Sequence, residues 1–149
     1  MTTKQELVER ILGLTDSIYR TLQVSIPPEW LSSDLTVAQL RVLLLLHTEG
    51  ALRMSAVAAK LGIAVSTATG IMDKLVAKGF VLRQADEQDR RLVVMRLSPA
   101  GTKLMNAVWE LGRAQIEKLL QGLDTAELKQ AAELVRLLRE RLPPGSISS

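Results

Sequence analysis

The chain has 149 residues, 47% of them hydrophobic and 3% aromatic, which is typical of a folded protein with an aliphatic core. It contains no cysteine, which excludes a disulfide framework, a thiolate zinc site and a thiol redox switch. The formal net charge is +3, and no apolar run approaches the ~20 residues of a membrane span. We therefore expect a cytoplasmic protein with no membrane partner.

The positive charge is concentrated in the middle of the chain. Between Met54 and Lys103 there are eight basic and four acidic residues, whereas the rest of the chain carries 11 basic and 12 acidic ones. A basic segment on a near-neutral scaffold is typical of a module that faces phosphate. A surplus of four charges can also arise by chance, so the pattern needs support from motifs.

The N-terminal part of the chain is predicted to form two helices. Apolar residues recur every three or four positions from Thr3 to Val24, which predicts an amphipathic helix that ends at the following prolines. Trp30 then lies in a predicted loop. A capping box, Thr36 to Gln39, begins a second helix that extends to His47. Because this helix is apolar on most sides, we expect it to be buried at the centre of the fold.

Two short helices and a hairpin follow. Residues 54–61, with Ser55 as the expected cap, and residues 65–78 predict two helices separated by Gly62, which is a helix-turn-helix pattern. Residues 80–84 and 92–97 are rich in β-branched and apolar side chains and predict two strands. The charged loop between these strands makes the pattern that of a winged helix-turn-helix.

The C-terminal part is again helical. Ser98 and Pro99 begin a long helical region that Gly122 interrupts, and a capping box, Asp124 to Glu127, begins a final helix that ends at Leu142.

The predicted fold class is mainly α (α+β), in one domain over residues 1–149. A winged helix-turn-helix DNA-binding region, 36–97, lies between helical dimerisation regions at 1–30 and 99–142. The amphipathic terminal helices carry more apolar surface than the small winged region can cover. We therefore predict that they pair with a second copy of the chain; the alternative is a monomer whose ends pack on each other.

Three stretches resemble the MarR (multiple antibiotic resistance regulator) family of transcription regulators. Residues 61–81 resemble the recognition helix of that family, residues 86–101 its wing and the start of its next helix, and residues 35–39 the opening of its second helix. The resemblance implies a homodimeric repressor, without metal or cofactor, that binds a pseudo-palindromic operator in double-stranded DNA. It also implies release by a small effector, aromatic or anionic.

The candidate DNA contacts form two groups. Short or polar residues near the start of the second helix can approach base edges, and a lysine one turn further on suits a phosphate. Two arginines at the hairpin tip can enter a narrow minor groove, and the resemblance implies that an aspartate orients one of them in an Asp-x-Arg pair. The residues are Ser66, Thr67, Thr69, Gly70 and Lys74 in the helix and Asp89, Arg90 and Arg91 in the wing.

One departure from the family pattern lies at the start of this helix. Ala64 and Val65 stand where relatives often carry a capping Ser or Thr and then Pro or a basic residue. This departure puts the first contacts of the helix with DNA in question, although it leaves the predicted fold unchanged.

The candidates for an effector site are aromatic or basic residues expected near the dimer core. They are Tyr19, Trp30, Arg41, His47 and Trp109. Packing in the dimer core is the alternative role for the aromatic residues, and a place at a helix end is the alternative for His47.

Two other classes of function are weighed against a DNA-binding regulator. A winged domain can serve as a protein-interaction module without specific DNA binding. An enzyme is disfavoured, because one histidine, no cysteine, dispersed carboxylates and no glycine-rich phosphate loop leave no recognisable catalytic group.

Overall fold

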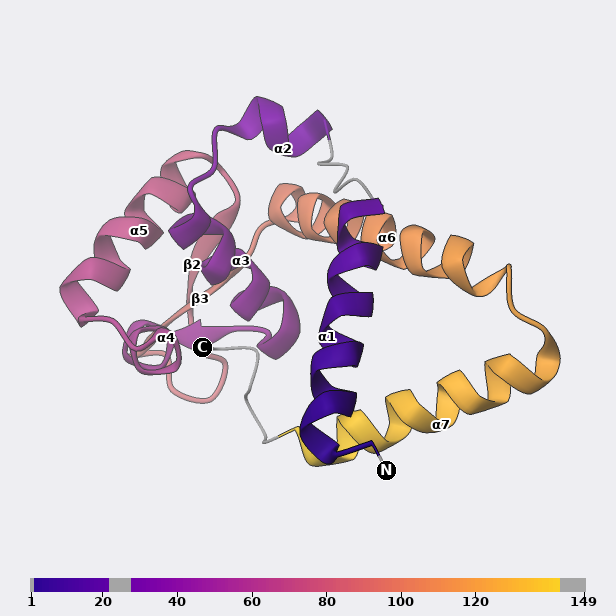
Figure 1. Cartoon of the computed structure of the whole chain (residues 1–149). Helices are drawn as coiled ribbons and strands as arrows, with labels where there is room; N and C mark the ends of the chain where they lie inside the picture. Colours follow the sequence, from indigo (N-terminus) through magenta and orange to yellow (C-terminus); the bar gives the residue numbers. More distant parts are fainter. Residues whose placement is uncertain (1, 22–27, 143–149) are drawn as a thin grey trace.

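The computed structural model describes residues 2–21 and 28–142 of the chain. Figure 1 shows a compact winged part and a set of long terminal helices that extend away from it. The helices are α1 (Lys4–Thr21), α2 (Pro28–Ser33), α3 (Val37–Glu49), α4 (Met54–Leu61), α5 (Val65–Ala77), α6 (Pro99–Leu120) and α7 (Thr125–Arg141), and the strands are β1 (Leu52–Arg53), β2 (Val81–Ala85) and β3 (Val93–Leu97). The predicted mainly helical class with a small wing hairpin is confirmed.

The sheet is antiparallel, in the strand order β1-β3-β2. Its hairpin pairs Val81 with Leu97 and Ala85 with Val93, so the wing loop begins after residue 85. Strand β1 was not predicted. It has only two residues, and a segment this short has no periodicity that sequence inspection could detect.

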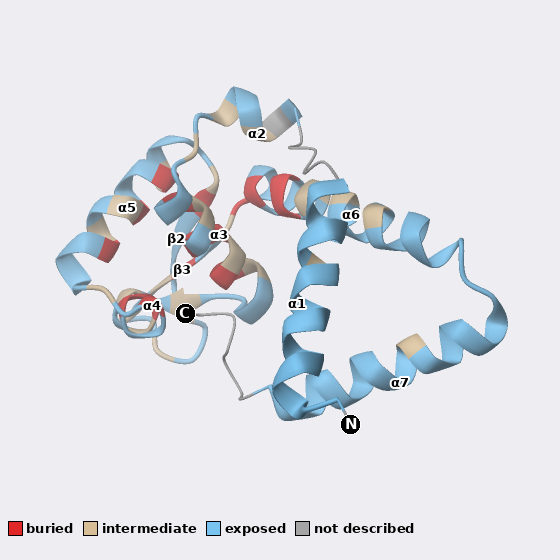
Figure 2. Cartoon of the chain, viewed as in Figure 1, coloured by how far each residue is buried: buried red, intermediate tan, exposed pale blue. Residues whose placement is uncertain are grey.

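The core lies around α3, as the sequence predicts. Val42 and Leu43 of this helix are fully buried, and they pack in one cluster with Met72 of α5, Met95 of β3 and Met105 of α6. Aliphatic and thioether side chains make up the fully buried cluster, in agreement with the low aromatic content. The start of α6 is thereby anchored on the winged part, whereas its second half leaves the core (Figure 2).

The predicted helix caps are confirmed at three of four positions. Thr36 and Asp124 form capping boxes with Gln39 and Glu127, and Ser98 caps α6. The prediction of Ser55 as a cap was wrong. Helix α4 follows directly from β1, so its cap position falls on Arg53, which makes no side-chain cap bond.

The predicted loop at Trp30 was also wrong, because residues 28–33 form helix α2. Pro28 begins this helix, where a missing N–H costs nothing and the fixed φ of proline suits a first helical residue. Trp30 is half-buried and packs on the core cluster. The predicted end of the first helix, at Val24, lies outside the described residues.

The terminal helices bury almost nothing within one chain. Neither α1 nor α7 has a buried residue, and Figure 2 shows both exposed along most of their length. Over residues 2–21 and 28–142, neither helix makes an extensive contact with another helix or strand. Within the described ranges, the apolar side chains of these two helices are therefore left largely uncovered.

In the same ranges, no single helix has the length and apolar content of a membrane span. Helices α4 and α5 reach that composition only when taken together, and a bend of 111° separates them.

Candidate nucleic-acid interface

Helices α4 and α5 form the predicted helix-turn-helix. They are joined by a turn in which Gly62 adopts the left-handed conformation, with φ of 65°, and the Ile63 N–H donates to the Ala58 carbonyl oxygen at 3.1 Å. Ala58 is buried. The bend of 111° lies within the usual range for this motif. Helix α5 therefore presents one of its faces outward.

That outward face of α5 carries four of the five predicted contact residues. Ser66, Thr67, Gly70 and Lys74 are exposed, while Ala68 and Leu75 on the opposite side are buried in the core.

The fifth residue, Thr69, lies differently. It is half-buried, and its hydroxyl donates to the Val65 carbonyl oxygen at 2.8 Å. The hydroxyl hydrogen of Thr69 is therefore engaged within the helix, although its oxygen can still accept.

The start of α5 has the departure noted in the sequence. Ala64 occupies the cap position in an extended conformation and makes no side-chain cap bond, and Val65 is exposed. By contrast, side chains cap α3, α6 and α7. Ala64 and Val65 thus place a small and an apolar side chain directly before the polar residues Ser66 and Thr67.

The wing loop is held in shape by Asp86. Its carboxylate accepts from the backbone N–H of Gln88 at 2.8 Å and of Asp89 at 3.4 Å, and it pairs with the Arg53 guanidinium of β1 at 3.7 Å. The Asp86 N–H donates to the Leu92 carbonyl oxygen at 2.8 Å, which closes the base of the loop. Together these bonds order a loop whose side chains are largely solvated.

Asp89 and Arg91 form the pair that the family resemblance implies. The Arg91 Nε and Nη2 donate to Oδ1 and Oδ2 of Asp89, both at 3.1 Å. These side-chain hydrogen bonds lower the pKa of the Asp89 carboxyl and raise that of the Arg91 guanidinium. A bidentate pair fixes the plane of the guanidinium, while the Arg91 side chain remains 89% exposed. Arg90 is exposed beside it, with no ion-pair partner in the described part of the chain.

Two further contacts, which sequence inspection missed, hold α5 in place. Arg83 of β2 pairs with Asp73 of α5 and so joins the wing hairpin to the helix. At the C-terminal end of α5, the Lys78 ammonium donates to the carbonyl oxygens of Ser33, at 3.1 Å, and of Asp34. Both contacts join segments far apart in sequence, so only the packing of the elements could reveal them.

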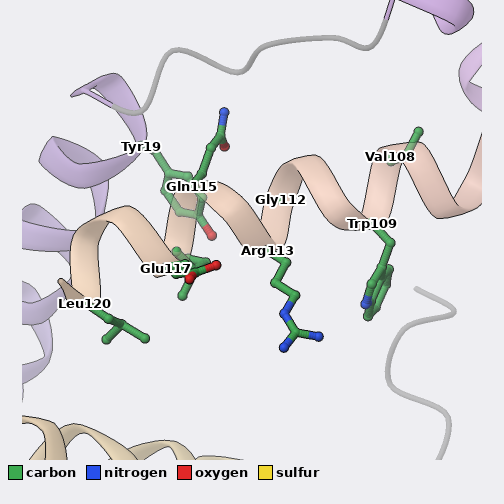
Figure 3. A pocket seen from close by; sticks show the side chains of 9 residues that line it. Tyr19, Val108, Trp109, Gly112, Arg113, Gln115, Glu117 and Leu120 are labelled. Atoms are coloured by element: carbon green, nitrogen blue, oxygen red, sulfur yellow. The ribbon is translucent and has the colours of Figure 1, made fainter.

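A groove of about 710 Å³ lies between α1 and α6 (Figure 3). Two of the predicted effector residues, Tyr19 and Trp109, line it. Figure 3 shows Trp109 and Arg113 projecting to the same side of α6, whereas Tyr19 reaches the groove from α1. An aromatic wall with a guanidinium beside it can hold a small aromatic anion.

The other three predicted effector residues do not line this groove. His47 lies next to it, with its ring centroid 6.1 Å from that of Trp109 and the two planes inclined by 50°. Trp30 packs on the core and Arg41 is exposed on α3. The basic residue of the groove is Arg113, which was not among the predicted effector residues. Among the described residues, no group of three or more His, Asp or Glu side chains could hold a metal ion.

Comparisons with known proteins agree with this architecture. The sequence model of the MarR family matches residues 35–93. The uncharacterized HTH-type transcriptional regulator YfiV of Bacillus subtilis is 34% identical over 114 residues, which are 76% of this chain and 71% of YfiV. The HTH-type transcriptional repressor MdtR of the same organism is 25% identical over 140 residues, 94% of this chain and 90% of MdtR.

Solved structures show the same fold. The transcriptional regulator Tm0710 of Thermotoga maritima is 27% identical with a TM-score of 0.68, over 91% of this chain and 93% of that one. RV1404 of Mycobacterium tuberculosis is 20% identical with a TM-score of 0.77, over 95% of each chain.

Proposed function

The chain belongs to the MarR family of HTH-type transcriptional regulators, and on this premise we propose that it is a homodimeric repressor. It binds a pseudo-palindromic operator in double-stranded DNA and is released by a small aromatic or anionic effector. Residues 36–97 form the DNA-binding region, and residues 1–30 and 99–142 form the dimerisation region. One relative, MdtR, is named a repressor, which supports this direction of regulation.

The uncovered apolar faces of the terminal helices support the homodimer. Leu7, Ile11, Leu14 and Ile18 form a stripe along α1, and each is about half exposed or more. Helix α7 has a similar set, including Leu134, Val135 and Leu138. Single exposed apolar residues are ordinary, but continuous stripes on two helices mark an interaction surface. A second copy of the chain carries the same apolar stripes, and a two-fold axis brings the stripes of the two copies into contact.

DNA binding is supported most directly by two exposed surfaces on the winged part, one on α5 and one on the wing. Helix α5 presents a face of small polar residues, and the wing presents Arg91 in a plane set by Asp89. In a dimer, the two copies of α5 enter successive major grooves about one helical turn apart. Each Arg91 reaches into an adjacent minor groove, where a narrow groove strengthens the negative potential.

The groove between α1 and α6 supports the effector site. Tyr19 and Trp109 offer aromatic faces, and Arg113 offers a charge for a carboxylate. The α6 residues that line the groove follow directly on the part of α6 that is buried in the winged core, and α1 belongs to the dimerisation region. A ligand between α1 and α6 therefore changes the spacing of the two DNA-binding regions. The ligand lowers operator affinity only to the extent that it binds the dimer arrangement that has released DNA more tightly than the arrangement that binds DNA.

A DNA-selection assay with purified protein tests the operator, followed by salt titration on the enriched site. We expect a palindromic motif and a steep fall of affinity with salt, which reflects release of counterions from phosphates. Failure to enrich any sequence at any salt concentration, with a dimer confirmed by sizing, would overturn the proposal in favour of a protein-interaction module.

Tryptophan fluorescence tests the effector site, since Trp109 lines the groove. Benzoate serves as a small aromatic anion and benzyl alcohol as its neutral counterpart. We expect benzoate to change the emission and to weaken operator binding. The variant Arg113→Gln should lose the preference for benzoate over benzyl alcohol, and an unchanged preference would remove Arg113 from the site.

A further inference from the structure

Gly70 is a glycine that the folded chain does not require. It is the sixth residue of α5, has helical backbone geometry, and is exposed. A Cβ atom built at this position would meet nothing within 4 Å. Gly101 differs, because a Cβ there would overlap the Phe80 carbonyl oxygen. Glycine inside a helix is disfavoured relative to alanine, so Gly70 weakens α5 without a benefit within the chain.

The neighbours of Gly70 make a gap on the outward face of α5. Residues three and four positions apart lie side by side on a helix, so Ser66 and Thr67 border Gly70 on one side and Asp73 and Lys74 on the other. All four are exposed. The missing side chain therefore leaves bare backbone at the centre of the face that we assign to the major groove.

The side chains of α5 limit what this face can recognise. The helix contains no Arg, Asn or Gln, whereas bidentate reading of guanine uses Arg or Lys and that of adenine uses Asn or Gln. Its carboxylate, Asp73, is paired with Arg83. Its one cation, Lys74, lies a full turn beyond Gly70. Bare backbone at Gly70 offers an apolar CH₂ group, and the one apolar group on the major-groove edges of the bases is the C5-methyl of thymine.

We propose that Gly70 receives the C5-methyl group of one thymine in each operator half-site, and that DNA rather than the fold requires glycine here. The inference rests on the proposed function, since it names a base feature that α5 reads. Gly70 would then determine specificity because its lack of a side chain leaves room for the thymine methyl group.

The test pairs an added methyl group on the protein with a removed one on the DNA. The protein variant is Gly70→Ala, and the DNA variants replace each thymine of the selected half-site in turn by deoxyuridine, which lacks only the C5-methyl. For the wild-type chain we expect one position at which this replacement weakens binding roughly fourfold, as for loss of one buried methyl group. Gly70→Ala should bind the unmodified operator on the order of tenfold more weakly. Deoxyuridine at that same position should restore its binding.

The thermal stability of the same variant provides a second measurement, which should increase while operator affinity falls. Gly70→Ala should raise the Tm by about 3 °C, because alanine favours the helix and meets no neighbour. The matched control is Gly13→Ala in α1, where a Cβ also meets nothing within 4 Å and the position lies off the apolar stripe. This control should raise the Tm similarly and leave operator affinity unchanged.

The outcomes separate the inference from the function on which it rests. Absence of any selected operator for the wild-type chain overturns both. If the wild-type chain binds an operator but Gly70→Ala binds it equally well, or deoxyuridine restores nothing, the inference alone fails. A lower Tm, or a failure to fold, for Gly70→Ala would show that the fold does require glycine and would also overturn it.

Discussion

The proposed dimer can be tested at Ile11 of α1. This side chain is 58% exposed in the single chain, within a helix that has no buried residue. The change Ile11→Ala shortens an apolar side chain without weakening the helix, since alanine has the highest helix propensity. Any effect on assembly therefore reports a lost contact with the partner.

The exposed fraction sets the size of the effect. The substitution removes three carbon groups, worth about 0.8 kcal/mol each when fully buried, or about 2.4 kcal/mol in total. Only the exposed 58% of the side chain is left for a partner to cover, which reduces the loss to about 1.4 kcal/mol for each copy. A two-fold dimer loses this twice, about 2.8 kcal/mol, so the dimer dissociation constant should rise about 100-fold.

Sedimentation equilibrium over a range of protein concentrations measures this constant, and circular dichroism checks that the helices are retained. The matched control is Val93→Ala in β3, where an apolar side chain is 55% exposed but lies in the wing hairpin. We expect the control to dimerise like the wild-type chain. If Ile11→Ala also dimerises with an unchanged constant, the stripe on α1 is not part of the interface and the argument from its exposure is wrong.

Four further predictions concern the wing and the packing beneath it. Arg91→Ala should weaken operator binding and reduce the salt slope by about 1, with the dimer and the Tm unchanged because the side chain is exposed; unchanged affinity would mean that the wing does not touch DNA. Asp89→Asn should also weaken binding although it removes a negative charge, because Arg91 loses the partner that orients it, and tighter binding would contradict that role. Arg91 lowers the pKa of the Asp89 carboxyl below its ordinary 3.8. The carboxylate therefore keeps its negative charge above pH 3.8 and loses it only as the pH falls through the lowered pKa. We therefore expect the ratio of wild-type to Asp89→Asn operator affinity to be constant from about pH 5 to 8. Gly101→Ala should cost about 1–3 kcal/mol in urea unfolding, because the new Cβ overlaps the Phe80 carbonyl oxygen, and an undiminished stability would show that the backbone can move aside.

The features that could be predicted from sequence are local ones. The capping boxes at Thr36 and Asp124 each depend on two residues three positions apart, and both are present. Gly62 ends α4 in the left-handed conformation, as its place between two apolar helices indicated. The order of helices and hairpin follows in the same way, because each element is specified by its own periodicity and end signals.

The errors of prediction fall where local signals are short or ambiguous. Six residues of α2 and two of β1 are too few to show a helical or alternating pattern. Trp30 therefore seemed to lie in a loop, although packing on the core holds it in a helix. Ser55 has the right side chain for a cap, but the preceding strand places the cap position at Arg53.

The candidate site divides along the same line. Sequence alone determined which segment forms α5 and which residues lie in the wing loop, because a resemblance in motif and a helical period are properties of contiguous residues. Only the tertiary structure decided that Asp73 pairs with Arg83, and that Arg113 rather than Arg41 lines a groove with Tyr19 of α1. These facts depend on how separate elements pack and on which way each side chain faces, and such long-range geometry is not written in the spacing of residues along the chain.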